Sequence, residues 1–180
     1  MKRKIILTAF AATSLIFSST QAFALINFSA GIPISHSFTG NWYDGDAVES
    51  DGTSGMFIQV GVPIFPGVGM DSYKTKLKDT EDAELATMIY NLYYLLPIPI
   101  INLTLGVGAG STELKCDVCS SVFDKGSATQ WYASFGFPII PLFDLHLSYR
   151  SVSSKMGIKG SSNEHDFSGN VMGLGIGFNF

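Results

Sequence analysis

A stretch without charged residues, from Leu85 to Thr112, most constrains how this chain can fold, because two prolines interrupt it in the middle. The stretch is long enough for a membrane-spanning helix, which needs about 20 apolar residues. Pro97 and Pro99, however, would remove two backbone donors and clash with the preceding helical turn. The sequence therefore argues against a helix here and leaves an apolar segment that must fold in another way.

Alternation with a period of two predicts that this segment is extended. From Ile101 to Ala109 every second residue is apolar, and the residues between them are small or polar. The end of the chain, from Met172 to Phe180, repeats the pattern with glycine or asparagine at the alternate positions. Such alternation is typical of strands with one apolar face. It indicates eight strands, at 25–34, 56–62, 68–78, 86–94, 101–110, 130–137, 143–150 and 171–180.

The strand at 68–78 fits the alternation least well, because Val68 and Met70 share a phase with Lys74 and Lys76. A β-bulge adds one residue to a strand and reverses the phase beyond it. We therefore expect a bulge near 71–72 that turns both lysines toward the inside of a barrel. The residues that would then face outward are Tyr73, Thr75 and Leu77.

The composition indicates which side of such a barrel is apolar. Hydrophobic residues make up 46% of the chain and charged residues only 14%, so a large apolar surface must face something other than water. A soluble barrel would expose its polar face, but here that face is largely glycine, serine and asparagine. We therefore expect lipid outside, and a closed barrel, because lipid cannot hydrogen-bond an open sheet edge. The predicted fold is an all-β, eight-stranded, antiparallel up-and-down transmembrane β-barrel.

Three short segments combine two prolines with apolar residues, at 62–68, 95–103 and 137–143. Proline cannot donate to a β-ladder, so it is expected where strand pairing stops. Eight strands have seven connections, and a barrel of this kind has three short turns on one side and four longer loops on the other. We assign the prolyl segments to the short turns. The four loops, which carry most of the charge, are 35–54, 78–82, 111–127 and 153–166.

The first residues predict export. A basic start at 2–4 precedes an apolar run up to Phe17, and 22–24 has the small-x-small pattern that signal peptidase cleaves. We predict a signal peptide at 1–24 and one mature domain at 25–180. The net charge of −4, without a basic cluster, argues against nucleic acid as a partner.

The export signal, the eight strands and the terminal GLGIGFNF resemble the small outer-membrane β-barrels of Gram-negative bacteria, of the outer-membrane protein X and W kind. In that superfamily the barrel-assembly machinery reads a C-terminal aromatic residue, so the resemblance implies this role for Phe180, with Phe178 on the same face. It also implies a location in the outer membrane, outer-membrane lipid and lipopolysaccharide as partners, and a monomer.

Eight strands enclose a space that side chains can fill or that can hold one small ligand, so a wide pore is not expected. We expect a filled lumen with a polar cluster of Asp144, His146, Arg150 and Lys74. This interpretation describes a non-enzymatic structural or surface-interaction barrel without a cofactor or a metal ion. A narrow channel for small apolar molecules, similar to the outer-membrane protein W type, is the alternative.

Two motifs could carry chemistry. Cys116 and Cys119 could form a redox pair, half of a zinc site or a disulfide, and in an oxidising envelope we expect a disulfide. His146 and Ser148 place a base and a nucleophile on one strand face, and this step resembles the His-x-Ser motif of the outer-membrane lipid A deacylases. Tyr149 stands where that family has asparagine, and both side chains are expected to face the lumen. A lipid A-modifying hydrolase is therefore the last alternative.

Aromatic residues outside these motifs are assigned by the face on which they lie. Those on the outward phase are expected in girdles at the membrane interfaces, namely Trp131, Tyr149, Tyr90, Tyr94 and Phe178. Trp42 and Tyr43 lie in an acidic loop, where they could bind a partner or Ca²⁺. The acidic residues lack the spacing of an EF-hand, so a solvated loop is the favoured interpretation.

Overall fold

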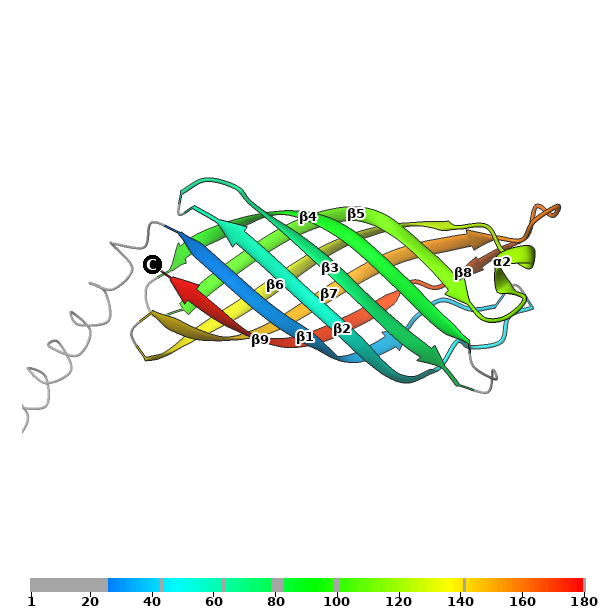
Figure 1. Cartoon of the computed structure of the whole chain (residues 1–180), viewed down its shortest axis with the longest axis horizontal. Helices are drawn as coiled ribbons and strands as arrows, with labels where there is room; N and C mark the ends of the chain where they lie inside the picture. The colour runs from blue at the N-terminus through cyan, green and yellow to red at the C-terminus, as the bar shows by residue number, and fades with distance from the viewer. Residues whose placement is uncertain are drawn as a thin grey trace, which may run out of the picture.

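The computed structural model describes residues 26–42, 44–62, 64–78, 83–98, 101–140 and 142–179. Eight antiparallel strands form a closed barrel, which confirms the predicted fold (Figure 1). They are β1 (Asn27–Phe38), β2 (Ser50–Gly61), β3 (Gly67–Leu77), β4 (Glu84–Ile98), β5 (Ile101–Lys115), β6 (Gly126–Ile140), β7 (Phe143–Gly157) and β9 (Gly169–Asn179). A short strand, β8 (Glu164–Asp166), and a short helix, α2 (Cys119–Val122), lie in loops at one end. In the described residues no helix is long and apolar enough to cross a membrane.

Each strand pairs with its neighbour in the chain, and β1 pairs with β9 to close the ring. This last ladder runs from Asn27↔Asn179 to Phe38↔Gly169. Closure of the ring gives every strand a partner on both sides over at least part of its length, as a sheet surrounded by lipid requires. The predicted signal peptide at 1–24 and the terminal Phe180 lie outside the described residues.

The two faces of the strands differ as the alternation predicts. Along β7 the side chains of Leu145, Leu147 and Tyr149 are exposed on the outside, whereas those of His146 and Arg150 are buried in the lumen. The same arrangement holds for β6 and β9, so the outer wall is apolar around the barrel. The inside collects the polar and small residues.

Three short connections lie at one end, which we call the inner end, and the longer loops lie at the other, the outer end (Figure 1). In the first connection the Phe65 amide donates to the Val62 carbonyl at 3.1 Å, and Ile64 has φ +78°. This left-handed backbone is unfavourable for a β-branched residue. Leu142 has a similar φ of +76° in the third connection.

Some prolines of these connections lie within the paired strands and not beyond their ends. Pro97 pairs with Asn102, and Pro138 pairs with Asp144, so both lie in the last rungs of their ladders. The end of a ladder tolerates a missing donor, which explains why pairing continues through these positions. Pro63, Pro99 and Pro141 lie outside the described residues.

The predicted bulge in β3 is absent, and that prediction was wrong. β3 pairs with β4 without a shift from Gly67↔Tyr93 to Lys76↔Glu84. Tyr73, Thr75 and Leu77 therefore face inward, and both lysines face outward. The outward face of β3 is apolar near the inner end and charged near the outer end. The same alternation therefore holds along the whole strand, and no bulge is needed to explain the lysines.

One joint of the barrel is much shorter than the others. Register pairs between β1 and β2 run only from Asn27↔Gly61 to Gly31↔Phe57. Beyond them β1 has an irregularity between Pro33 and Ser35, and β2 contains Gly52 and Gly55 with φ of +109° and +144°. We call the unpaired parts, 32–38 and 50–56, the β1–β2 seam.

Candidate functional site: a polar plug in the barrel lumen

A buried ion pair crosses the lumen of the barrel. The Arg150 guanidinium on β7 donates from Nε to Asp71 Oδ2 on β3 at 2.9 Å. β3 and β7 are four strands apart in either direction around the ring, so they are opposite walls. Arg150 is 2% exposed and Asp71 0%. Two such charges are stable in an apolar membrane region only when each satisfies the other.

Neighbouring side chains complete the environment of this pair. Gln130 on β6 donates from Nε2 to Asp71 Oδ2 and to Asn91 Oδ1, each at 2.6 Å. Arg150 Nη1 bonds to the Ser148 hydroxyl oxygen. The guanidinium carbon lies 3.5 Å from the centre of the Phe57 ring, an arrangement that stabilises a cation. We call this set, with Asn91, Gln130, Ser148 and Phe57 around Asp71 and Arg150, the polar plug.

A second polar layer lies closer to the inner end. Asp144 accepts hydrogen bonds from the amides of Asn102 and Asn179, and its Oδ2 lies 3.9 Å from His146 Nε2. Tyr93 donates to Asn27 Oδ1 at 2.8 Å across the same region. Together the two layers fill the inner half of the lumen.

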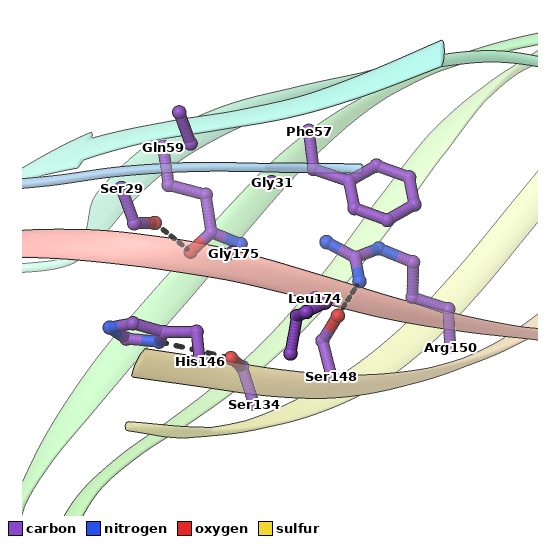
Figure 2. Close-up of a pocket in the computed structure, with 11 residues that line it drawn as sticks. Ser29, Gly31, Phe57, Gln59, Ser134, His146, Ser148, Arg150, Leu174 and Gly175 are labelled. Carbon is purple, nitrogen blue, oxygen red and sulfur yellow. Dashed lines mark hydrogen bonds between the residues drawn. The ribbon is translucent and has the colours of Figure 1, made fainter. Parts of the chain in front are cut away.

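Figure 2 shows the cavity between the two layers, which is lined by Gln59, Ser134, His146, Ser148 and Arg150, among others. Its volume is about 20 Å³. That volume has room for about one water molecule, because a water needs roughly 10–15 Å³ of such space. A solute cannot occupy it without displacing the plug.

The predicted lumen cluster is divided between these layers. Asp144, His146 and Arg150 all lie in the lumen, but Arg150 pairs with Asp71 rather than with Asp144. Lys74 lies outside, where it forms an ion pair with Glu84 at 3.1 Å, so its placement in the cluster was wrong. The error follows from the bulge that we expected in β3. Asp71 was not predicted as the partner of Arg150, although an acidic residue on the inward phase in the middle of a strand could have indicated it.

His146 and Ser148 do not form a nucleophile and base pair. His146 Nδ1 is 3.2 Å from the Ser134 hydroxyl, and Ser148 donates to the Gly173 carbonyl at 3.2 Å while it also contacts Arg150. Acyl transfer requires the base to accept the proton of the nucleophile. Both side chains are buried in the lumen, where a lipid substrate has no access.

The outer end of the lumen is closed by an apolar cluster, which we call the outer cap. Cys116 and Cys119 form a disulfide in the third loop, and Cys119 is buried in this cluster. Trp42 packs edge-on against His165 and Phe167, so it is part of the cap, and Tyr43 lies outside the described residues. The buried members are Val48, Leu77, Ala83, Leu85, Leu114, Cys119, Met156 and Phe167.

Phe178, predicted as part of the assembly signal, lies on the outward face of β9. Its ring centre is 4.8 Å from that of Phe143 and 6.3 Å from that of Phe28. In the described residues no group of three or more His, Cys, Asp or Glu side chains is placed to hold a metal ion.

Solved structures share this fold, whereas no family model and no curated protein matches the sequence. Neisserial surface protein A aligns over 86% of this chain and 95% of its own, with a TM-score of 0.54 and 14% identity. The E. coli outer membrane protein W aligns over 87% of this chain and 98% of its own, with a TM-score of 0.55 and 10% identity. The chain therefore has the fold of small outer-membrane β-barrels, and its apolar outer wall is that of a barrel surrounded by lipid.

Proposed function

We propose that this protein is a non-enzymatic barrel whose lumen is closed by its own side chains and which acts through its outer surface. The supporting observation is the Asp71–Arg150 pair, which joins opposite walls and leaves a cavity of only about 20 Å³ nearby. The outer cap supports a surface role, because a disulfide closes a turn of the third loop and residues from each of the four outer connections, namely Val48, Ala83, Cys119 and Phe167, pack in one apolar cluster. A preordered surface loses less entropy when it binds a partner.

Conductance across planar lipid bilayers tests the closed lumen. The wild-type protein is expected to show no discrete conductance steps. The variant Asp71→Ser/Arg150→Ser removes the side chains that cross the lumen, and it is expected to conduct once Tyr93→Ser and Phe167→Ser also open the second polar layer and the outer cap. The matched control Lys74→Ser/Glu84→Ser removes an exposed ion pair instead and should stay silent. Discrete steps from the correctly folded wild-type barrel would contradict the proposal.

A second function is favoured by the β1–β2 seam, namely the transfer of small apolar molecules from the outer end into the membrane. Two unpaired strand segments leave a gap in the wall hydrogen bonding, and Ile32 and Met56 beside it are 56% and 50% exposed. Phe38, at the end of the seam on β1, packs against the outer cap. An apolar molecule that displaced cap side chains would therefore reach lipid without passing the polar plug.

Uptake of a radiolabelled alkane by cells that express the protein tests this route. The variant Ser54→Trp places a large side chain beside the seam on β2, and we expect it to reduce uptake. Thr129→Trp is the matched control, because Thr129 is also exposed but pairs on both sides, with Ala109 and with Ser153. Equal uptake by both variants and by cells without the protein would exclude transfer through the seam.

A further inference from the structure

The inner end of the barrel carries exposed apolar side chains that neither the plug nor the seam explains. Ile64 is 81% exposed, Phe65 67% and Ile139 65%. The sequence has no charged residue in the segments 62–70, 85–112 and 126–143, which contain the three connections. Further exposed apolar residues at this end are Val62, Ile98, Ile140 and Leu142. A surface in contact with water would be expected to carry charge.

The upper limit of the apolar outer wall is marked by aromatic residues. The rings of Trp131 and Tyr149 are 5.8 Å apart, and the Tyr149 hydroxyl donates to Asn170 at 2.8 Å. On β6 and β7 the exposed residues beyond this level are polar, such as Thr129 and Lys155. An aromatic girdle followed by polar residues is the usual boundary of the membrane region.

The height of the apolar wall follows from the strand geometry. From Trp131 to Ile140, at the inner end of β6, the chain advances nine residues (140 − 131). With a rise of about 3.3 Å per residue and a tilt of about 40°, that distance corresponds to about 23 Å along the barrel axis. The apolar band of such barrels is about 25 Å tall. The wall therefore matches the membrane only when the residues of the inner connections are counted in it.

We propose that the exposed apolar residues described at the inner end are embedded in the inner leaflet of the outer membrane, with phospholipid as the occupant of this end face. They are Val62, Ile64, Phe65, Ile98, Ile139, Ile140 and Leu142. The exposed side chains of these connections are uncharged and continue the apolar outer wall, which is expected to meet lipid. The barrel then ends within the membrane on its inner side, and the polar outer parts of β4 to β7 stand outside the membrane and carry the outer cap.

A single introduced cysteine tests this placement, because the two native cysteines are joined in a disulfide. Ile64→Cys would be labelled with an environment-sensitive fluorophore in the full barrel, reconstituted in phosphatidylethanolamine and phosphatidylglycerol vesicles. Val107→Cys, at an exposed position within the apolar wall, is the lipid control, and Lys76→Cys, at an exposed position beyond it, is the water control. We expect Ile64→Cys to show blue-shifted emission and quenching by brominated lipid, as for Val107→Cys.

Two outcomes would overturn the proposal. The first is emission from Ile64→Cys that matches Lys76→Cys and is quenched by iodide in the buffer. The second is a blue shift that disappears when the protein is diluted with lipid, because that result would assign the end face to a second copy of the chain. Leu142→Cys, in another connection, repeats the measurement if the Ile64→Cys barrel does not fold.

Discussion

The Asp71–Arg150 pair can be tested by removing one charge and then both. Arg150→Met leaves the Asp71 carboxylate buried in the lumen with only Gln130 as a side-chain donor. Two unit charges about 4 Å apart attract by about 4 kcal/mol at an effective dielectric constant of 20. Breaking a buried pair on one side generally costs about 3–5 kcal/mol. We therefore expect Arg150→Met to lower the free energy of unfolding by about that amount.

The double variant Asp71→Asn/Arg150→Met separates this mechanism from a simple loss of packing. Without either charge no buried ion remains uncompensated, so we expect it to regain at least about 2 kcal/mol relative to Arg150→Met. Urea unfolding in lipid vesicles, followed by tryptophan fluorescence and by the heat-dependent gel shift of folded barrels, measures both values. The exposed pair of Lys74 and Glu84 is the control, and Lys74→Met should cost at most about 1 kcal/mol.

The reasoning would be refuted by either of two results. One is an Arg150→Met barrel within about 1 kcal/mol of the wild type, which would mean that water reaches the pair and screens it. The other is a double variant less stable than Arg150→Met, which would mean that stacking on Phe57 and side-chain volume, rather than charge compensation, stabilise the plug.

Two further predictions concern the lumen glycines and the outer cap. Gly106→Ala is expected to lower the free energy of unfolding by about 1–3 kcal/mol, because the new Cβ would lie 2.3 Å from the Tyr132 ring. Gly157→Ala is the control, because its Cβ would meet only one atom, at 3.9 Å. Urea titration of both variants measures the difference, and equal stabilities would contradict the prediction. Burial lowers the pKa of His165 in the cap, and Asp44 partly opposes this shift. His165 therefore binds a proton more readily in the unfolded loop than in the folded cap. The cap should be stable above about pH 6.5 and lose stability as the pH falls below that value. Limited proteolysis of the loops at pH 7.5 and pH 5 measures the effect, and an unchanged pH response in His165→Phe would argue against it.

The alternation of residues predicts the barrel and, for most strands, which side chains face the lumen. It does so because lipid outside selects apolar side chains, whereas the lumen selects polar or small ones. Asp144, His146 and Arg150 follow from this rule. β3 shows its limit, since the outward face of one strand passes from lipid at Val68 to water at Lys74. If the outward face is assumed to be apolar along the whole strand, the two lysines can be explained only by a bulge, and β3 has none.

Other features depend on how different strands are placed relative to one another in the barrel, which the sequence of a single strand does not indicate. Asp71 became visible as the partner of Arg150 only when β3 and β7 were placed on opposite walls. The outer parts of β6 and β7 were missed because they stand beyond the apolar wall, where the outward face becomes polar while Val152 and Met156 are buried on the inward face. The β1–β2 seam was missed for a different reason, since strand segments that lack a pairing partner keep an ordinary residue pattern.

The seam also determines how the ring resists being pulled apart. β1 is joined to β9 by eleven register pairs but to β2 by only five. Backbone amides that lack a ladder partner exchange with solvent most readily, so breathing motions should concentrate at this joint. Unzipping under mechanical force would therefore start between β1 and β2, and β1 would leave the ring still attached to the C-terminal strand.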